Sequence, residues 1–194
     1  DGWTPRYNVA PTQLAPVIVC RPERSLELLR WGLVPRFAVD LAAGNKLINA
    51  RIETAAQRPS FREAMTARRC IVPVTGFYEW KRVRGRRAKQ PMWIRERDGG
   101  VLALAGLWEA WTAPTGEVVE TFAIITRDAS GLVREIHDRM PVALNASWLK
   151  AWLDPEATPA QLARALVATA ADTSRLEAIA VGTGVNAPAH DAPD

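Results

Sequence analysis

The chain has 194 residues, 48% of them hydrophobic and 24% charged, and this ordinary globular balance leads us to expect a single domain over residues 1–194. The net charge of +4 permits a polyanionic partner but does not require one. No apolar run reaches the ~18 residues of a membrane span and no signal peptide is visible, so we expect a cytoplasmic protein without a membrane partner.

Short strands dominate the first three quarters of the chain, separated by turns rich in Gly and Pro. The expected strands are Pro16–Cys20, Leu26–Gly32, Leu47–Ile52, Cys70–Val74, Gly76–Lys81, Met92–Glu96, Leu102–Trp108 and Thr121–Thr126. Many short strands at this spacing predict a curved, mainly antiparallel sheet or an open β-barrel.

Three helices are expected to flank this sheet, which makes the fold class α+β. The first begins at Pro59, the second spans roughly Ala146–Leu153, and the third begins at Pro159 with Thr158 as its N-cap. Each carries an apolar stripe at helical spacing. The stripes are Phe61, Ala64 and Met65 in the first helix, Leu149, Trp152 and Leu153 in the second, and Leu162, Ala165, Leu166 and Thr169 in the third.

The two cysteines, Cys20 and Cys70, lie in apolar runs, and we expect both to be buried thiols of a reducing compartment. No Cys/His cluster has the spacing of metal ligands. No glycine-rich phosphate loop or dinucleotide fingerprint is present. We therefore expect neither a metal nor a cofactor.

Three polar side chains stand inside apolar, strand-like segments: Asn49, Glu79 and His137. Unpaired polar groups cost free energy when buried, so such residues usually pair with one another or carry chemistry. A Glu and a His that converge on one cleft make an acid/base pair, and an Asn can orient a substrate. Alternate side chains of a strand share a face, so Arg51 should lie beside Asn49, where it could bind a phosphate.

These residues also have purely structural interpretations. Glu79 could form an ion pair with Arg51 or Lys81, and His137 could be a core histidine held by a backbone carbonyl. Asp138 could orient the ring of His137, but neighbours on an extended chain face opposite ways, which argues against this contact.

A dense run of cations follows Glu79. Gly85 marks the tip of a hairpin that carries six of them: Lys81, Arg82, Arg84, Arg86, Arg87 and Lys89. The run is either a solvated hairpin tip or an edge that contacts phosphates, and the sequence leaves both open.

Five motifs occur in a fixed order along the chain. They are Arg6-Tyr7-Asn8-Val9-Ala10-Pro11-Thr12, Trp31-Gly32-Leu33-Val34-Pro35, Ile48-Asn49-Ala50-Arg51-Ile52-Glu53-Thr54, Gly76-Phe77-Tyr78-Glu79-Trp80-Lys81 and Ile136-His137-Asp138-Arg139-Met140-Pro141. Together they resemble the SRAP family, the SOS-response-associated peptidases that process abasic sites. The likeness runs from Arg6 to about Asn186, where the tail fits the family's closing loop.

The resemblance implies a DNA-repair protein that senses abasic sites in single-stranded DNA. In this family an N-terminal cysteine attacks the ring-opened sugar: its amine forms an imine and its thiol closes a thiazolidine, which crosslinks the protein to DNA. By resemblance, Asn49 holds the site, Glu79 shuttles protons in ring opening and propeptide release, and His137 polarises the sugar oxygen. The implied DNA contacts are Arg51, Phe37, Pro11, Thr126, Arg36 and Arg139. We expect a monomer with self-processing peptidase or lyase activity, associated with the nucleoid when bound to DNA.

Two departures from the family pattern matter. The sequence starts at Asp1, without the family's Met-Cys-Gly-Arg, and neither Cys20 nor Cys70 can substitute, because the chemistry needs a free α-amine on the same residue. We expect the cysteine-bearing segment to precede Asp1. Where the family often has aromatic residues that wedge against bases, this chain has Phe37 followed by Ala38, and each lost base stack costs roughly 1–3 kcal/mol.

Two other functions remain open. The same sheet could be a non-catalytic module that binds single strands through the basic hairpin and aromatic side chains. A conventional protease or hydrolase built on Glu79 and His137 is disfavoured, because the sequence has no oxyanion-hole motif and no independent nucleophile. A cysteine at position 2 of the full-length reading frame would separate the crosslinking protein from the binding module.

Overall fold

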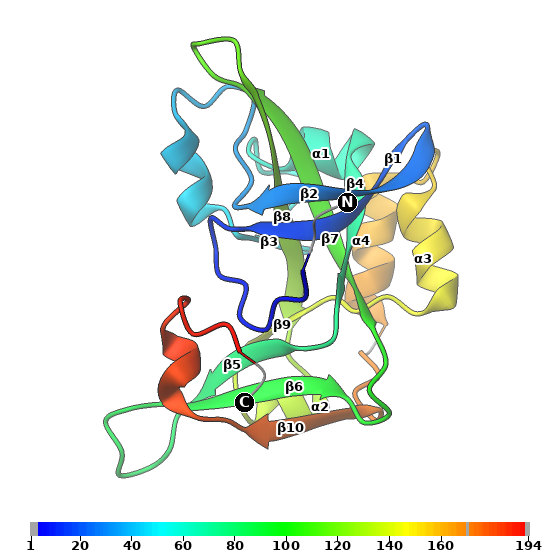
Figure 1. Cartoon of the computed structure of the whole chain (residues 1–194). Coiled ribbons are helices and arrows are strands. Elements are labelled where there is room, and N and C mark those ends of the chain that lie inside the picture. The colour runs from blue at the N-terminus through cyan, green and yellow to red at the C-terminus, as the bar shows by residue number, and fades with distance from the viewer. Residues whose placement is uncertain (1–3, 170, 193–194) are drawn as a thin grey trace.

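The computed structural model describes residues 4–169 and 171–192, and a five-stranded barrel forms its centre (Figure 1). The barrel strands are β1 (Leu14–Arg21), β2 (Glu23–Trp31), β4 (Arg69–Val74), β7 (Leu102–Thr112) and β8 (Val118–Asp128). They run antiparallel in the order β2-β1-β4-β7-β8, and a short parallel pairing of β2 with β8 closes the barrel.

Two short strands extend this sheet along β8. β3 (Asn49–Arg51) pairs with β8 in parallel, and β9 (Arg139–Pro141) pairs with it antiparallel. Thr126 of β8 therefore stands opposite Arg51 on one side and Pro141 on the other. Two of the polar motifs, far apart in sequence, thus meet at one end of the barrel.

A second, smaller sheet lies below the barrel in Figure 1. It consists of β5 (Phe77–Lys81), β6 (Gln90–Glu96) and β10 (Leu176–Ala180), antiparallel in the order β10-β6-β5. β5, which carries Glu79, is therefore an edge strand of this sheet. The loop 82–89 joins β5 to β6 and projects beyond both strands.

Helices and apolar clusters hold the two sheets in place. α1 (Arg62–Ala67), α3 (Ala146–Leu153) and α4 (Pro159–Ala168) belong to one apolar cluster with barrel strands; its members include Phe61, Met65, Trp152, Leu162, Leu166, Ile71, Leu107 and Ile125. A second cluster joins the barrel to the smaller sheet and to α2 (Gly131–Arg134); it includes Val17, Leu29, Val72, Phe122, Ile94, Leu176, Val133 and Ile136. Two 3₁₀ helices span Leu41–Lys46 and Thr183–Asn186.

The α+β class and the mainly antiparallel, curved sheet are confirmed, and all eight expected strands are present. β9 and β10 were not predicted. β9 has only three residues, and β10 is an edge strand next to a polar loop, so neither offers a long alternating pattern. The part of the chain that the structure describes contains no helix long and apolar enough to cross a membrane.

Three local expectations were wrong. The helix expected at Pro59 begins only at Arg62, because turns occupy the residues before it. In α4, Leu162 and Leu166 are buried, but Ala165 and Thr169 are exposed. Cys70 is buried as expected, whereas Cys20 is exposed because it stands beside the turn between β1 and β2.

Candidate active site

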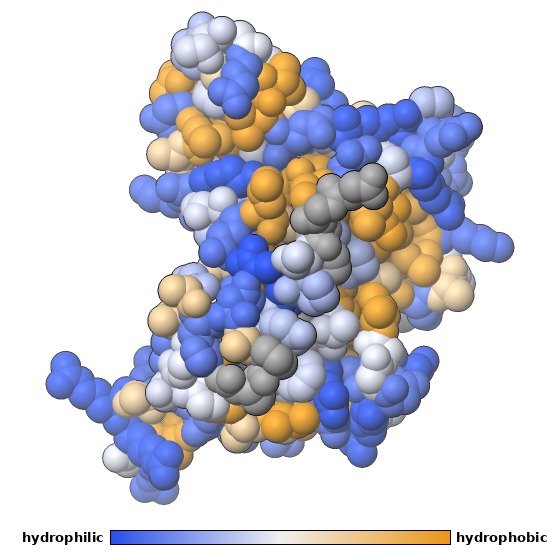
Figure 2. All heavy atoms as spheres, in the orientation of Figure 1, coloured by the Kyte–Doolittle hydropathy of each residue, from blue (hydrophilic) through white to orange (hydrophobic). Residues whose placement is uncertain are grey.

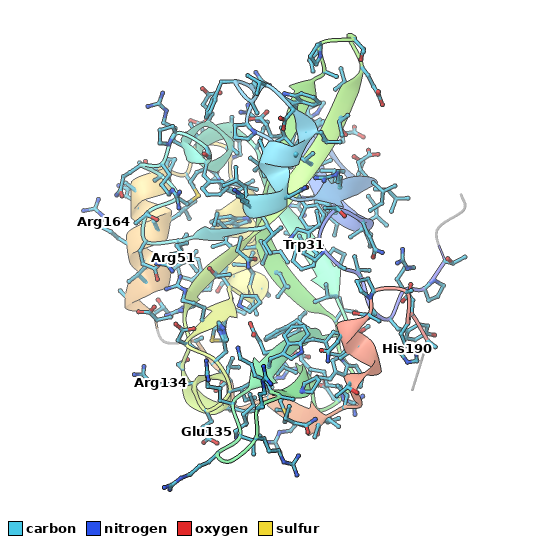
Figure 3. All side chains as sticks on the ribbon, turned by 90° about the vertical axis from the view of Figure 1, so that its left-hand side faces the viewer. Trp31, Arg51, Arg134, Glu135, Arg164 and His190 are labelled. Atoms are coloured by element: carbon cyan, nitrogen blue, oxygen red, sulfur yellow. The ribbon has the colours of Figure 1, made fainter. Side chains whose placement is uncertain are left out.

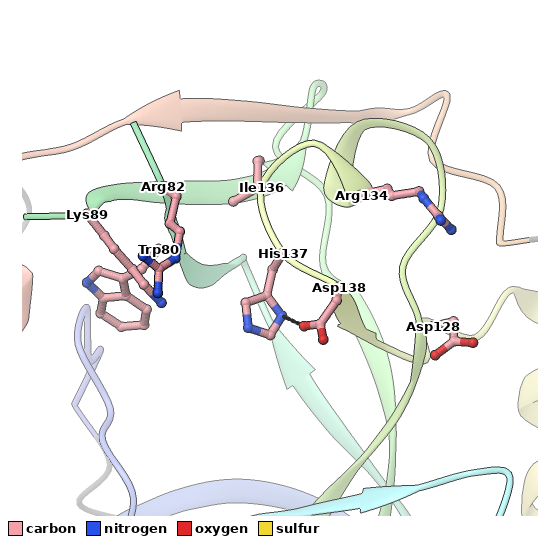
Figure 4. Close-up of a pocket in the computed structure, with 8 residues that line it drawn as sticks. All are labelled: Trp80, Arg82, Lys89, Asp128, Arg134, Ile136, His137 and Asp138. Carbon is pink, nitrogen blue, oxygen red and sulfur yellow. Dashed lines mark ion pairs between the residues drawn. The ribbon is translucent and has the colours of Figure 1, made fainter. Parts of the chain in front are cut away.

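An open hollow of about 630 Å³ lies where the second sheet meets the segment after α2 (Figure 4). Its walls come from three parts of the chain: Trp80, Arg82 and Lys89 from the β5–β6 hairpin, Asp128 from the end of β8, and Arg134, Ile136, His137 and Asp138 from α2 and the residues after it. The space-filling view shows the molecule indented between the barrel and the second sheet, with hydrophilic side chains gathered there (Figure 2).

Glu79 lies close to His137, which lines this hollow. Glu79 Oε1 lies 3.8 Å from His137 Nδ1, and the side chains are 21% and 35% exposed. Burial raises the pKa of Glu79, and the attraction of His137 and Lys89 opposes this rise without cancelling it. Glu79 therefore keeps its proton to a higher pH than an ordinary carboxyl group, which suits a group that donates and recovers a proton. Glu79 thus lies near His137, as the sequence suggested, although only His137 is among the residues that line the hollow.

His137 is held by the short helical turn before it. Val133 is fully buried and Ile136 nearly so, and the backbone N–H of His137 donates to Val133 O at 2.9 Å. Gly131 starts this turn with a φ of +48°, in the left-handed region that favours glycine. The turn thus fixes the backbone of His137 while its ring faces the hollow.

The imidazole has polar partners on its Nδ1 side. In the tautomer that carries its proton on Nε2, Nδ1 accepts a hydrogen bond from the N–H of Arg139 at 3.1 Å. Asp138 Oδ1 lies 3.1 Å from the same Nδ1 and can accept a hydrogen bond from it when that nitrogen carries a proton. The argument against an Asp138 contact was wrong, because the chain curls after α2 instead of running extended. In the other tautomer, Nδ1–H can donate to Arg139 O at 3.2 Å, which is the backbone carbonyl of the structural interpretation.

β3 presents Asn49 and Arg51 on one side and buries Ala50 on the other, as the alternation predicted. Both polar side chains are exposed, and Figure 3 shows Arg51 at the surface. Among the described residues no salt bridge joins Glu79 to Arg51 or to Lys81, so the structural ion pair that the sequence left open is not formed. Arg51 remains available to an anionic ligand.

Arg139 ties the site to the barrel. Its guanidinium donates to both carboxylate oxygens of Glu53, at 3.0 and 2.9 Å, to Thr126 O at 2.9 Å, and to Asp128. Its side chain is only 17% exposed. Burial would raise the pKa of Glu53, but the hydrogen bonds and charge of Arg139 outweigh it, so that this pKa is lowered. A DNA phosphate at Arg139 would have to compete with two carboxylates.

Replacing Arg139 with Ala should lower the free energy of unfolding by about 1–3 kcal/mol, because it leaves charged hydrogen-bond partners unpaired. The loss should shrink as the pH falls through the lowered pKa of Glu53, since protonated Glu53 no longer forms the ion pair. Denaturant unfolding at several pH values measures both effects. Arg175→Ala is the matched control: this arginine also contacts two carboxylates but is 63% exposed, so we expect a loss below about 1 kcal/mol. Equal losses in both variants would contradict an anchoring role for Arg139.

The remaining candidate DNA contacts lie elsewhere. Thr126 is buried beside Arg51, and Pro11 is half-buried in the turn before β1. Arg36 forms an ion pair with Glu109 at 2.9 Å, and Phe37 is 67% exposed. Arg36 and Phe37 line a separate small cavity and do not reach the hollow around His137.

Several residues at the hollow were not expected there. Trp80 was not singled out as a site residue, yet its side chain lines the hollow together with His137. Arg134 gave no sequence signal, whereas the cation run after Glu79 was a signal for Arg82 and Lys89. In the described ranges, no group of three or more His, Cys, Asp or Glu side chains could hold a metal ion.

The chain was compared with known proteins. A family model described as SOS response associated peptidase (SRAP) matches residues 1–188. The chain is 41% identical over 193 residues to the abasic site processing protein YoqW of Bacillus subtilis, covering 99% of this chain and 85% of that protein. It is 42% identical over 187 residues to the abasic site processing protein YobE of the same organism, covering 96% and 84%. A crystal structure of a protein from Bacteroides thetaiotaomicron superposes with a TM-score of 0.80 at 32% identity, covering 91% of this chain and 78% of that chain.

Proposed function

The chain belongs to the SOS response associated peptidase (SRAP) family, and we propose that it recognises abasic sites in single-stranded DNA and attaches to them covalently through an N-terminal cysteine. The observation that carries this proposal is the Glu79–His137 pair: the two side chains are 3.8 Å apart, His137 lines an open hollow, and burial raises the pKa of Glu79. The names of the relatives, abasic site processing proteins, support the choice of substrate. The apolar cluster shared by the barrel and the second sheet supports a single domain.

The proposed reaction begins with the closed sugar of the abasic site. Ring opening needs a proton on the ring oxygen and loss of the proton from the anomeric hydroxyl, which releases the aldehyde. Glu79, which holds its proton to a raised pH, donates and recovers this proton, and His137 donates a hydrogen bond from Nε2 to the sugar oxygen. The carboxyl group and the imidazole thereby act on the two oxygens that change in this step, the ring oxygen and the oxygen of the anomeric hydroxyl.

Bond formation then takes two steps. The α-amine of the cysteine adds to the aldehyde carbon and water leaves, which gives an imine. The thiol adds to the imine carbon, its proton passes to the nitrogen, and a thiazolidine closes. We propose that exposed Asn49 orients the cysteine and the sugar, and that Arg51 binds a neighbouring phosphate. Glu79 also serves in release of a propeptide that masks the cysteine, and the Glu79–His137 pair assists reversal of the crosslink.

A denaturing gel tests this function. Protein made from the complete reading frame should form a band that resists denaturation when it meets a single strand with one abasic site. Two control strands should give no band: an undamaged strand, and one whose abasic sugar has been reduced with borohydride and so lacks the aldehyde. A shift on native gels without any band on denaturing gels would instead favour the non-catalytic binding module.

Arg51→Ala should weaken binding to undamaged single strands, because this exposed cation contacts a phosphate in the proposal. Loss of one contact should reduce the slope of log K against log salt by about 0.7. The control is Arg24→Ala, which removes an exposed cation beside the turn between β1 and β2. Fluorescence anisotropy over a range of salt concentrations measures the slopes. If both variants behave like the wild type, Arg51 does not contact the DNA backbone.

A further inference from the structure

The basic hairpin carries two kinds of cation. Arg82 and Lys89 stand at its two legs, directly after β5 and directly before β6, and both line the hollow that contains His137. Arg84, Arg86 and Arg87 surround the tip at Gly85, are exposed, and do not line the hollow. The legs and the tip can therefore be tested separately.

The two carboxylates that line the hollow already have partners other than Arg82, Lys89 and Arg134. Asp128 is bound by Arg139, and Asp138 lies 3.1 Å from the imidazole of His137. Arg82, Lys89 and Arg134 form no salt bridge with any residue in the described ranges. Figure 4 shows Arg82 and Lys89 on one side of His137 and Arg134 on the other. The hollow thus presents unpaired cations on two walls, with the proposed acid/base pair between them.

Trp80 adds an aromatic surface beside these cations. Its indole Nε1 donates to Asn186 Oδ1 at 2.7 Å, which fixes the ring against the loop that follows β10. The side chain is half-buried and lines the hollow next to Arg82 and Lys89. A fixed indole beside unpaired cations is the combination by which proteins bind single strands, with phosphates on the cations and a base stacked on the ring.

We infer that Trp80, Arg82, Lys89 and Arg134 form a binding arm for the single strand that flanks the lesion. Phosphates lie between the hairpin legs and Arg134, and a base next to the abasic nucleotide stacks on Trp80. This inference rests on the proposed function, because it places the flanking strand beside Glu79 and His137. A small anion would not need cations on two walls of an open hollow of about 630 Å³, whereas a strand that crosses it would.

The test compares two double variants of equal charge change. Arg82→Ala with Lys89→Ala removes the leg cations, and Arg84→Ala with Arg86→Ala removes two tip cations. Binding to an undamaged oligonucleotide is measured by anisotropy between about 50 and 200 mM salt. We expect the leg variant to lose about 1.4 from the salt slope, because about 0.7 is lost for each phosphate contact. We expect the tip variant to keep the wild-type slope.

A pair of substitutions tests stacking in the same assay. Trp80→Leu should weaken binding roughly 5- to 150-fold, and Trp80→Phe, which keeps an aromatic face, should recover most of the affinity. Thermal melting of each variant shows that it is folded before its affinity is compared.

The possible results distinguish failure of the binding arm from failure of the proposed crosslinking function. The binding arm is wrong if the wild type binds single strands and the leg variant keeps the wild-type salt slope. It is also wrong if the leg and tip variants lose the same amount of salt slope. If the wild type binds with the expected leg dependence but forms no crosslink, the arm stands and the crosslinking chemistry fails. If the wild type binds no single-stranded DNA, both are wrong.

Discussion

Glu79→Gln is expected to slow crosslinking to abasic-site DNA by on the order of 10²-fold or more, the usual contribution of a positioned acid or base. Gln has almost the same shape as Glu but cannot donate and recover a proton. Glu79 is partly buried at an edge strand and its pKa is raised, so the substitution removes the group that supplies the proton for ring opening. Single-turnover crosslinking, sampled over time on denaturing gels, measures the rate.

Folding and DNA affinity should survive this substitution. Because the pKa of Glu79 is raised in the folded state, its contribution to stability is present at low pH and is lost as the pH rises through that pKa. The variant should therefore be at least as stable as the wild type at neutral pH. The substitution removes a negative charge, so it adds no repulsion toward DNA phosphates and should not weaken DNA binding. An unfolded variant, or a folded one that crosslinks at the wild-type rate, would show that Glu79 has a structural role only.

Replacement of the proposed N-terminal cysteine by serine should abolish crosslinking, because serine cannot close a thiazolidine. Neither internal cysteine can supply this chemistry, since neither carries a free α-amine. Cys20 is exposed beside a turn of the barrel, and the Cys70 thiol is fully buried, with its pKa raised by that burial. The same denaturing gel measures the loss.

Cys20→Ala is the matched control for the serine variant. It removes an exposed thiol outside the residues that line the hollow, so crosslinking should proceed at the wild-type rate. If the 194-residue form, which starts at Asp1, crosslinks as well as the protein with the N-terminal cysteine, the proposed nucleophile is wrong.

The sequence predicted those parts of the site that depend on local alternation. Exposed Asn49 and Arg51 around buried Ala50 follow from the period of two in a strand. The sequence also predicted that Glu79 and His137 lie close together. This prediction used the free-energy cost of burying polar groups in apolar segments, together with the family resemblance. The strand positions could be predicted because alternating and apolar runs of residues are local properties of the sequence.

Long-range pairings could not be predicted in this way. Glu53 and Arg139 are 86 positions apart, and only the meeting of β3 and β9 on β8 brings them together. The contact between Asp138 and His137 depended on a bend of the chain after α2 that no residue pattern predicted. The place of Trp80 in the hollow depends on the β5–β6 hairpin lying beside residues 134–138, which are far from it in sequence.

The most direct measurement is the mass of the denatured adduct between the protein and abasic-site DNA, followed by protease digestion to locate it. The account predicts a mass equal to protein plus DNA minus one water, with the DNA on the peptide that begins with the N-terminal cysteine. Borohydride should leave that mass unchanged, because a thiazolidine, unlike an imine, is not readily reduced. An adduct on an internal lysine or on Cys20, or one that gains two hydrogens with borohydride, would contradict the account.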